Sequence, residues 1–346
     1  MSLILTRMQN IRAKANLDKW EQRASKYGVF DLFLRDTDHP MGIISPELKA
    51  KAFASIGSTL EVPVIDYDGA VAIGNSRTVT IADDENTSAM QSITFATYTF
   101  GFTQVPSAFH NNEIGLERDW EAKFLKNLYA LGAALDTAGV TALTAQKSQV
   151  FGDLLEFSNA ANVLTAAAAA EQRLLGGLNS VFQANDYDGD SLNVVGNTGV
   201  RYGISQMDEK GVYNDSNKTI QYSDKNVTYS NRIANAAVSK AAGFAVVPGT
   251  VGLLTRVERE ALMGVKSKTG HEWAVETLPL LNIPCGIYTY ESVGDYNAIS
   301  GAATADITRG HKVHYGFAVD VAMVTPYASA IATNASPIVK FGVTNA

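Results

Sequence analysis

The sequence predicts an α+β fold in which a long helix and a long strand pack along each other. Within 113–146, large apolar residues recur at three- and four-residue spacing, which is the period of a helix that buries one stripe. The stripe consists of Trp120, Phe124, Leu128, Leu131, Leu135, Ala138 and Ala142. From Val313 to Met323 every second residue is apolar, which predicts one long strand. Both elements would be at least about 35 Å long. We therefore expect everything between Phe151 and Gly310 to form an inserted second lobe.

The first elements are predicted by helix-capping residues. A loose apolar spacing permits a helix over 3–26. Ser45 and Pro46 are typical of a helix start, and this short helix should end at Gly57. Its expected buried face is Leu48, Ala52, Phe53 and Ile56. For the long helix, Asn111 or Asn112 is the expected cap.

Strands are predicted next, over Leu60–Asp66, Thr78–Ala82 and Gln91–Val105, joined by turn residues such as Asp68-Gly69. In the last of them the large residues change phase, which indicates a bulge or a change of covered side. The segment Ile65–Met90 has few large apolar residues. It is therefore either an excursion without contacts or a ribbon that lies on something outside its own lobe.

The inserted lobe is predicted to mix helices with short strands. A second helix should run from Ala166 past Phe182 and end at Asn185-Asp186, and 208–232 should be a loop or an exposed hairpin. A strand over Phe244–Pro248 precedes a helix with a capping box at Thr255–Glu258. Two further strands are expected, at Leu278–Leu281 and Gly286–Glu291.

Composition predicts a soluble folded protein whose main function is not to bind phosphates. The net charge is -7, whereas phosphate affinity comes from clustered Lys and Arg. The first 35 residues are an exception, with seven basic against three acidic residues, which indicates either a solvated helix face or an arm that docks on an acidic neighbour. Cys285 is the only cysteine, and we expect a buried structural thiol in a strand. Arg7 interrupts the apolar start, so no signal peptide is predicted. Pro326 and Pro337 make 321–339 a poor membrane span.

Acidic and histidine clusters give no metal site. Asp186, Asp188 and Asp190 form a D-x-D-x-D run, but Ser191 and Asn197 occupy the positions where a calcium loop needs Gly and Glu, so a solvated turn is favoured over a cation site. His311 and His314 would point to opposite faces of their strand, with no Glu placed to help them. The remaining histidines, His39, His110 and His271, are isolated in the sequence.

No catalytic or cofactor-binding motif is present, so we expect no catalytic residue, metal or cofactor. Asp136 is the one charge between Leu128 and Gln146. A hydrogen bond at a helix end or between subunits is the favoured interpretation, and a buried catalytic acid is the alternative. Asn-x-Ser/Thr sites at Asn86, Asn217 and Asn226 carry no weight without an export signal.

Four segments of the sequence resemble one protein family. FTQVPSAFHNNEIGLERDWEAKFLKNLYALGAALDTAGVTAL resembles the spine helix and its approach in the major capsid proteins of tailed bacteriophages, which have the Hong Kong 97 fold. GFAVVPGTVGLLTRVEREALMG with LPLLNIPCGIYTYESVGDYN resembles their axial domain, and HKVHYGFAVDVAMVTPY resembles their closing peripheral strand. The resemblance covers most of the chain from about Gly57 onward.

The resemblance implies a division into four parts. These are an N-terminal arm at 1–56, an extended hairpin loop at 57–91, a peripheral domain at 92–159 and 302–346 with a spine helix at about 113–146, and an axial domain at 160–301. It implies a structural coat protein without enzymatic activity that self-assembles through hexamers and pentamers into an icosahedral head shell around double-stranded DNA. The virion is the implied location, after assembly in the host cytoplasm, with no membrane involved.

Further partners are implied by the same resemblance. The leader is too short for a large built-in scaffolding domain, so a separate scaffolding protein or none is expected, with portal and decoration proteins as other partners. No lysine and asparagine pair for covalent cross-linking is identifiable. Two other functions stay open: a glycan-binding or surface-binding virion protein that uses 208–232, and a hydrolase that uses Asp186, Asp188 or His271.

Overall fold

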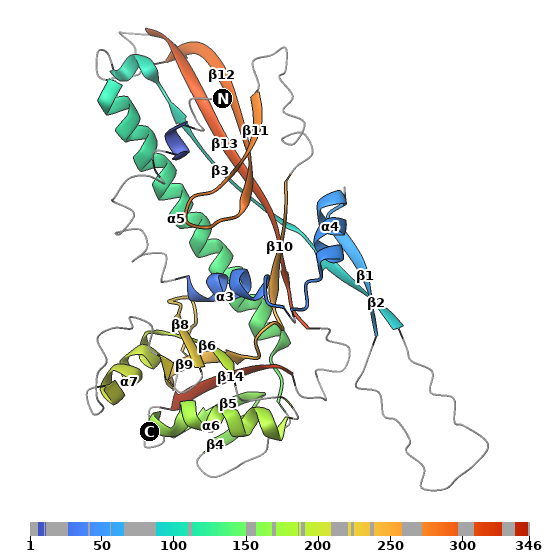
Figure 1. Ribbon diagram of the computed structural model, residues 1–346. Coiled ribbons are helices and arrows are strands. Elements are labelled where there is room, and N and C mark those ends of the chain that lie inside the picture. Colours follow the sequence, from blue (N-terminus) through green and yellow to red (C-terminus); the bar gives the residue numbers. More distant parts are fainter. Residues whose placement is uncertain are drawn as a thin grey trace, which may run out of the picture.

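The computed structural model has an elongated α+β fold with two lobes and a projecting two-stranded ribbon (Figure 1). It describes residues 6–9, 11, 27–40, 42–55, 57–65, 88–109, 113–149, 157–167, 171–185, 187, 191–208, 221–222, 225–235, 239–257, 272–296, 308–326 and 336–344. All structural statements below concern these residues.

The first lobe consists of one helix against an antiparallel sheet. Helix α5 spans Glu113–Gln146, and its 34 residues give a rod of about 50 Å. The sheet contains β3 (Ala96–Gln104), β10 (Gly252–Arg256), β11 (Glu272–Thr277), β12 (Pro284–Tyr296) and β13 (Thr308–Val324). Strand β13 is central: β3 pairs with one of its edges, and β12 and then β10 pair with the other. The predicted long helix and long strand are thus both present, and they share one core (Figure 1).

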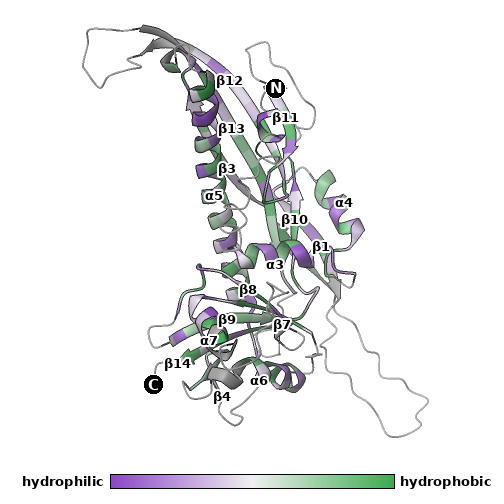
Figure 2. Cartoon of the chain, turned by 60° about the vertical axis from the view of Figure 1, so that its left-hand side comes forward, coloured by the Kyte–Doolittle hydropathy of each residue, from purple (hydrophilic) through white to green (hydrophobic). Residues whose placement is uncertain are grey.

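Aromatic rings fill the space between α5 and the sheet. The Trp120 and Phe124 rings stack with centroids 5.1 Å apart, and Trp120 meets Tyr315 of β13 edge-on at 6.1 Å. Phe100 of β3 stacks on Phe317 of β13 at 4.7 Å. Figure 2 shows hydrophobic and hydrophilic segments alternating along α5. The alternation of β13 therefore places its large residues toward the helix, as its sequence predicts.

The predicted stripe of α5 is buried as far as Leu135 and then shifts by one residue. Ala138 and Ala142 are half-buried, whereas Gly139 and Leu143 are buried. The reason is helix α3 (Gly28–Asp36), which crosses the second half of α5. A Cβ atom on Gly139 would lie 2.7 Å from Val29 Cγ1, so only glycine allows this approach.

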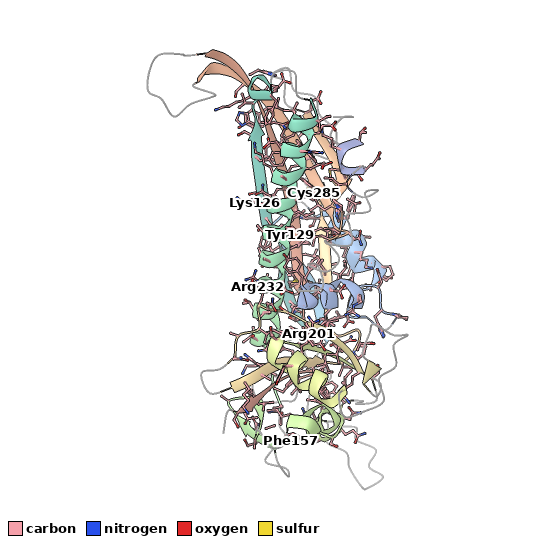
Figure 3. All side chains as sticks on the ribbon, turned by 90° about the vertical axis from the view of Figure 1, so that its left-hand side faces the viewer. Lys126, Tyr129, Phe157, Arg201, Arg232 and Cys285 are labelled. Atoms are coloured by element: carbon pink, nitrogen blue, oxygen red, sulfur yellow. The ribbon has the colours of Figure 1, made fainter. Side chains whose placement is uncertain are left out.

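The second lobe is a mixed seven-stranded sheet. Its order is β4 (Phe157–Ala160), β5 (Val163–Ala166), β14 (Ile338–Thr344), β9 (Ser239–Val246), β6 (Leu192–Gly196), β8 (Lys225–Tyr229) and β7 (Gln221–Tyr222). Helices α6 (Glu171–Ala184) and α7 (Thr198–Asp208) pack on one face, where Phe182 and Phe341 are fully buried. The opposite face, including Phe244 and Ile338, joins the core around α5. Figure 3 shows this lobe, marked by Phe157 and Arg201, beyond the end of the α5 lobe.

Sheet pairing corrects the predicted division of the chain. Strands β10, β11 and β12 lie within 160–301, the range expected to form the axial domain, yet they pair in the sheet of β13. Strand β14 lies within 302–346, expected in the peripheral domain, yet it pairs with β5 and β9 of the other sheet. Such long-range pairings are decided by neighbouring strands, which local periodicity does not encode.

The N-terminal elements are α3, α4 (Pro46–Ala54), β1 (Thr59–Ile65) and β2 (Ser88–Thr94), followed by β3 and a 3-10 turn at Pro106–Phe109. The Ser45 hydroxyl accepts a hydrogen bond from Leu48 N, so the predicted cap of α4 is confirmed. Its buried face is partly wrong, because Phe53 is 55% exposed while Leu48 and Ala52 are buried. The expected residue Ile56 lies outside the described residues, as do Asn111 and Asn112.

Two other local predictions are wrong, and a third is right only in part. Thr255 and Arg256 belong to strand β10 rather than to a capping box, because they pair with Val321 and Asp320. The segment 278–281 is a buried turn in which Leu280 has a φ of 72°. In 208–232, β7 and β8 pair antiparallel as a hairpin at the sheet's edge, as predicted, but Lys225 and Val227 are buried because β8 also pairs with β6. The predicted strand Thr78–Ala82 falls outside the described residues.

Candidate functional site

The first candidate site is the ribbon, defined as β1 and β2, which projects from the side of the first lobe (Figure 1). Its two strands pair with each other over seven residue pairs, from Thr59 with Thr94 to Ile65 with Ser88. Among the described residues neither strand belongs to another sheet. Met90 near the outer end is 60% exposed. A two-stranded sheet is marginal in water by itself. The segment Ile65–Met90, for which the sequence predicts a shortage of internal cover, overlaps the ribbon only at its outer end, and 66–87 lies outside the described residues, so that prediction stays a prediction.

The base of the ribbon is anchored in a small apolar cluster. Ile93 and Phe95 are buried there against Leu48 of α4, Leu254 of β10 and Val324 of β13. Phe95 also marks the point where the chain leaves the ribbon and enters β3, which is the cause of the phase change in the sequence. The ribbon is thus rooted in the first lobe at the end formed by Ile93 and Phe95.

A buried ion pair fixes this root. Arg256 Nε of β10 lies 3.0 Å from Asp320 Oδ2 of β13, and their side chains are 13% and 8% exposed. Thr97 Oγ1 donates to Asp320 Oδ1 at 2.6 Å, and Arg256 also donates to Gly57 O. The Arg256 guanidinium lies 4.4 Å from the centre of the Phe95 ring. Arg256 therefore joins strand β10 to β13 and to the chain that enters the ribbon, and Asp320 joins them to β3.

The second candidate site is the clamp on α3, in which Asp136 holds the start of that helix. Asp136 is fully buried, and its Oδ1 accepts from Val29 N and Phe30 N, both at 3.0 Å. Its other oxygen accepts from Ser230 Oγ. The carboxylate thereby satisfies amide groups that a helix start leaves unpaired. The helix-end interpretation of Asp136 is confirmed. Burial raises the pKa of this carboxyl, and its hydrogen bonds oppose the increase.

Asp36 holds the other end of α3. Its Oδ1 accepts from Asn193 Nδ2 of β6 at 2.9 Å, and its Oδ2 accepts from Gly249 N at 3.0 Å. Burial raises the pKa of Asp36 as well. Sequence reasoning missed this residue because its partners are more than 150 positions away. The clamp, defined as Asp136 and Asp36, ties the N-terminal helix to α5 and to the second lobe.

The N-terminal basic arm has one member in the core. Arg7 is 9% exposed, and its guanidinium carbon lies 5.7 Å from the centre of the Trp120 ring. Met8 and Ile11 beside it are buried in the core of the first lobe. Arg35 forms an ion pair with Asp31 at 3.0 Å on the surface. The other basic residues of the arm lie outside the described residues, so both interpretations of the arm stay predictions.

The histidines on β13 form two separate contacts. His311 Nε2 lies 2.9 Å from Glu291 Oε2, a partner that sequence reasoning missed because Glu291 is on β12. His314 Nε2 lies 2.8 Å from Ser292 Oγ, and its ring stacks on Tyr290 with centroids 4.2 Å apart. Burial lowers the pKa of His314. The described residues contain no group of three or more metal-ligating side chains.

The other candidate residues do not come together in one site within the described part of the chain. Cys285 is a fully buried thiol in β12, as predicted, and Figure 3 shows it among the strands of the first lobe. His39 lies in the turn after α3, and Asn226 lies on β8 next to Asn193. The remaining ones fall outside the described residues: Asn86, His110, Asp186, Asp188, Asp190, Asn217 and His271.

Helix α5 passes a length and hydropathy test for a membrane span, with a mean hydropathy of 1.2 over its most apolar window. The packing of this helix gives another reason for its apolar character. Its stripe from Trp120 to Leu143 lies in the core with β3 and β13.

Comparisons with known proteins give structural likenesses only. No protein-family model and no curated sequence matches the chain. A solved structure from Mycobacterium phage Che8 matches with a TM-score of 0.47 and 8% identity, over 85% of this chain and 87% of its own. A capsid structure of cyanophage P-SCSP1u matches with a TM-score of 0.45 and 10% identity, over 84% of each chain. The capsid of Ralstonia phage GP4 matches with a TM-score of 0.44 and 7% identity, over 84% of each chain. At these scores the likeness does not carry a function, and the proposal below rests on this chain's own residues and geometry.

Proposed function

We propose that this chain is the major capsid protein of a tailed bacteriophage, which self-assembles into the icosahedral head shell that encloses the viral genome. The observation that carries the proposal is the ribbon. It extends from a root fixed by the Arg256–Asp320 ion pair, and Met90 of its second strand is 60% exposed. A segment of this kind gains stability when it lies on another molecule, and repeated weak contacts add up across a closed lattice.

The proposed parts follow the sheets. The N-terminal arm is 1–56, and the extended loop runs from Gly57 through β2. The peripheral domain consists of α5 and the sheet of β13, which together form a long platform. The axial domain consists of the seven-stranded sheet with α6 and α7. The clamp on α3 supports this division, because it fastens the arm where the two lobes meet.

The proposed role is structural rather than enzymatic. Its main partners are further copies of the chain in hexamers and pentamers, with portal, decoration and scaffolding proteins as additional candidates. The net charge of -7 suits a shell that encloses packed DNA without adhering to it. The proposed location is the virion, after assembly in the host cytoplasm.

Sedimentation velocity and negative-stain microscopy of the purified full chain test this function. The expected result is closed shells or capsomers that form shells, tens of nanometres across. The matched comparison is a variant in which 62–91, the outer part of the ribbon with the residues between its strands, is replaced by a short Gly-Ser turn; it should fold and stay unassembled. A wild-type chain that remains a monomer at every protein concentration and salt concentration tested, with and without co-expressed phage proteins, would contradict the proposal.

A further inference from the structure

We propose that β2 of one copy adds as a strand to the open edge of β3 in a second copy, so that each ribbon extends the sheet of its neighbour. This inference rests on the proposed function and names the contact through which the copies join. It comes from a comparison of the sheet edges. Unpaired edges are templates for pairing with another chain, and monomeric proteins protect them.

Most sheet edges in the described part of the chain carry such protection. In the second lobe the edge strands are very short, with four residues in β4 and two in β7. In the first lobe, β11 carries Glu272 and Glu276 within six residues. Strand β10 is five residues long and ends at Arg256. Short length and charge are both ordinary means of blocking edge pairing.

Strand β3 lacks this protection. Its nine residues, ATYTFGFTQ, include no charge and no proline, and it pairs with β13 without a register shift. Gly101 is exposed, and because glycine has no side chain, its exposure is exposure of the main chain. Thr97 and Thr99 on the same side are exposed as well. A strand of this length and composition is a strong template for another strand.

The direction of the free groups on β3 follows from one contact. Lys123 Nζ of α5 donates to Thr103 O at 3.2 Å, so this carbonyl points away from β13. Alternate residues of a strand direct their carbonyls to the same side, so Gly101, Thr99 and Thr97 also present theirs to the open edge. Lys123 occupies the end near Thr103, and no described strand pairs with 97–101 on this edge.

The ribbon has one protected and one unprotected edge. Strand β1 carries Glu61 and Pro63, and a proline lies in a regular ladder when its nitrogen faces the open side. Strand β2, SAMQSIT, has neither charge nor proline. Its Met90, Ser92 and Thr94 are exposed. The β2 edge therefore resembles the β3 edge in having neither charge nor proline, whereas β1, which is equally long, has both.

The pairing has to be between copies. Ser92 and Thr99 are separated by seven residues of nearly continuous strand, about 23 Å, so the two edges of one chain do not meet. Because a ribbon edge meets a different surface on its neighbour, the contact is head-to-tail. Contacts of this type close into rings when the rotation between copies allows it. Hexamers and pentamers are such rings.

Paired cysteines test the contact, because the natural Cys285 is fully buried and leaves a clean background. The variant Ser92→Cys/Thr99→Cys, with neighbouring registers sampled by Met90→Cys and Thr94→Cys, is assembled and mildly oxidised. Directly opposed residues on neighbouring strands have Cβ atoms about 4.5 to 5.5 Å apart, so a shift of about 1 Å brings them within the roughly 3.5 to 4.5 Å that a disulfide needs. We expect a ladder of covalent oligomers starting at about twice the 37.0 kDa chain mass, and reduction should remove it.

Two control pairs locate the contact. In Glu61→Cys/Thr99→Cys the ribbon thiol lies on the protected edge of β1. In Ser92→Cys/Thr141→Cys the ribbon thiol stays on β2, and its potential partner lies on the exposed side of α5. Neither variant should give the ladder. If shells form but no β2 position cross-links to β3, or Glu61→Cys does so instead, this pairing is wrong while the proposed function stands. If the unmodified chain forms no assembly under any condition, both proposals fail. All variants alter exposed residues, and unchanged unfolding midpoints would show that they fold.

Discussion

Replacement of Asp136 by alanine should weaken the hold of α5 on the N-terminal helix. The substitution leaves three donors without their acceptor, namely Val29 N, Phe30 N and Ser230 Oγ. At about 1 kcal/mol for each buried hydrogen bond, the expected loss is roughly 3 kcal/mol. A chain of 346 residues has an unfolding entropy of about 0.7 kcal/mol/K, so the loss corresponds to a decrease in Tm of about 4 °C.

The matched control is Asp136→Asn. The amide oxygen can still accept from both backbone amides, the amide nitrogen can donate to Ser230 Oγ, and no charge is buried. We expect this variant to lie within about 1 kcal/mol of the wild type. Differential scanning calorimetry measures the stability of both variants. Hydrogen exchange at Val29 and Phe30 measures the contact itself and should accelerate about fivefold or more in the alanine variant only. Equal losses in the two variants, or unchanged exchange at these amides after Asp136→Ala, would refute the capping role.

Three further results are expected. Arg256→Met leaves Asp320 buried without its cation, so the free energy of unfolding should fall by about 3 to 5 kcal/mol. The double variant Arg256→Met/Asp320→Leu should recover much of this loss in urea titrations. If it recovered none, the ion pair between Arg256 and Asp320 would be contradicted. Gly139→Ala should destabilise the protein by about 1 to 2 kcal/mol, because overpacking against α3 exceeds the gain in helix propensity. Gly176→Ala on α6 should stabilise it by about 0.5 to 1 kcal/mol, because nothing lies within 4 Å of the added Cβ. If calorimetry gave the same sign for both variants, close packing of Gly139 against α3 would be excluded. Burial raises the folded pKa of Asp36 above its ordinary value of 3.8, so the folded state keeps this proton to higher pH than the unfolded chain. The resulting stability is complete below pH 3.8 and is lost as pH rises through the folded pKa. Relative to Asp36→Asn, the wild type should therefore gain stability as pH falls from 7 toward 4, and a pH-independent difference between their urea midpoints would contradict this.

Elements with a long, regular apolar period were predictable from the sequence. Helix α5 runs over 113–146 as its stripe predicts, and β13 has its large residues on the helix side. The cap at Ser45 was also local and correct. In each case the information lies within one element, in the period of its apolar residues or in the residue at its end.

Features that depend on distant partners were not predictable. Thr255 and Arg256 satisfy a helix-start pattern, yet pairing with β13 makes them a strand. The apolar run 278–281 is buried as a turn, because burial of Leu278 and Leu281 does not require a strand. The pairing of Arg256 with Asp320 joins residues 64 positions apart, and no local pattern indicates it. Asp136 was the exception, since a single charge in an apolar helix indicates a specific buried partner.

A reconstruction of the assembled particle by electron cryo-microscopy tests the central claim most directly. The account predicts that density for β1 and β2 of each subunit leaves its own body at Phe95 and lies along a neighbouring subunit, with no free ribbon in the shell. Density in which each ribbon folds back onto its own α5 lobe, or projects into solvent without touching another copy, would contradict it.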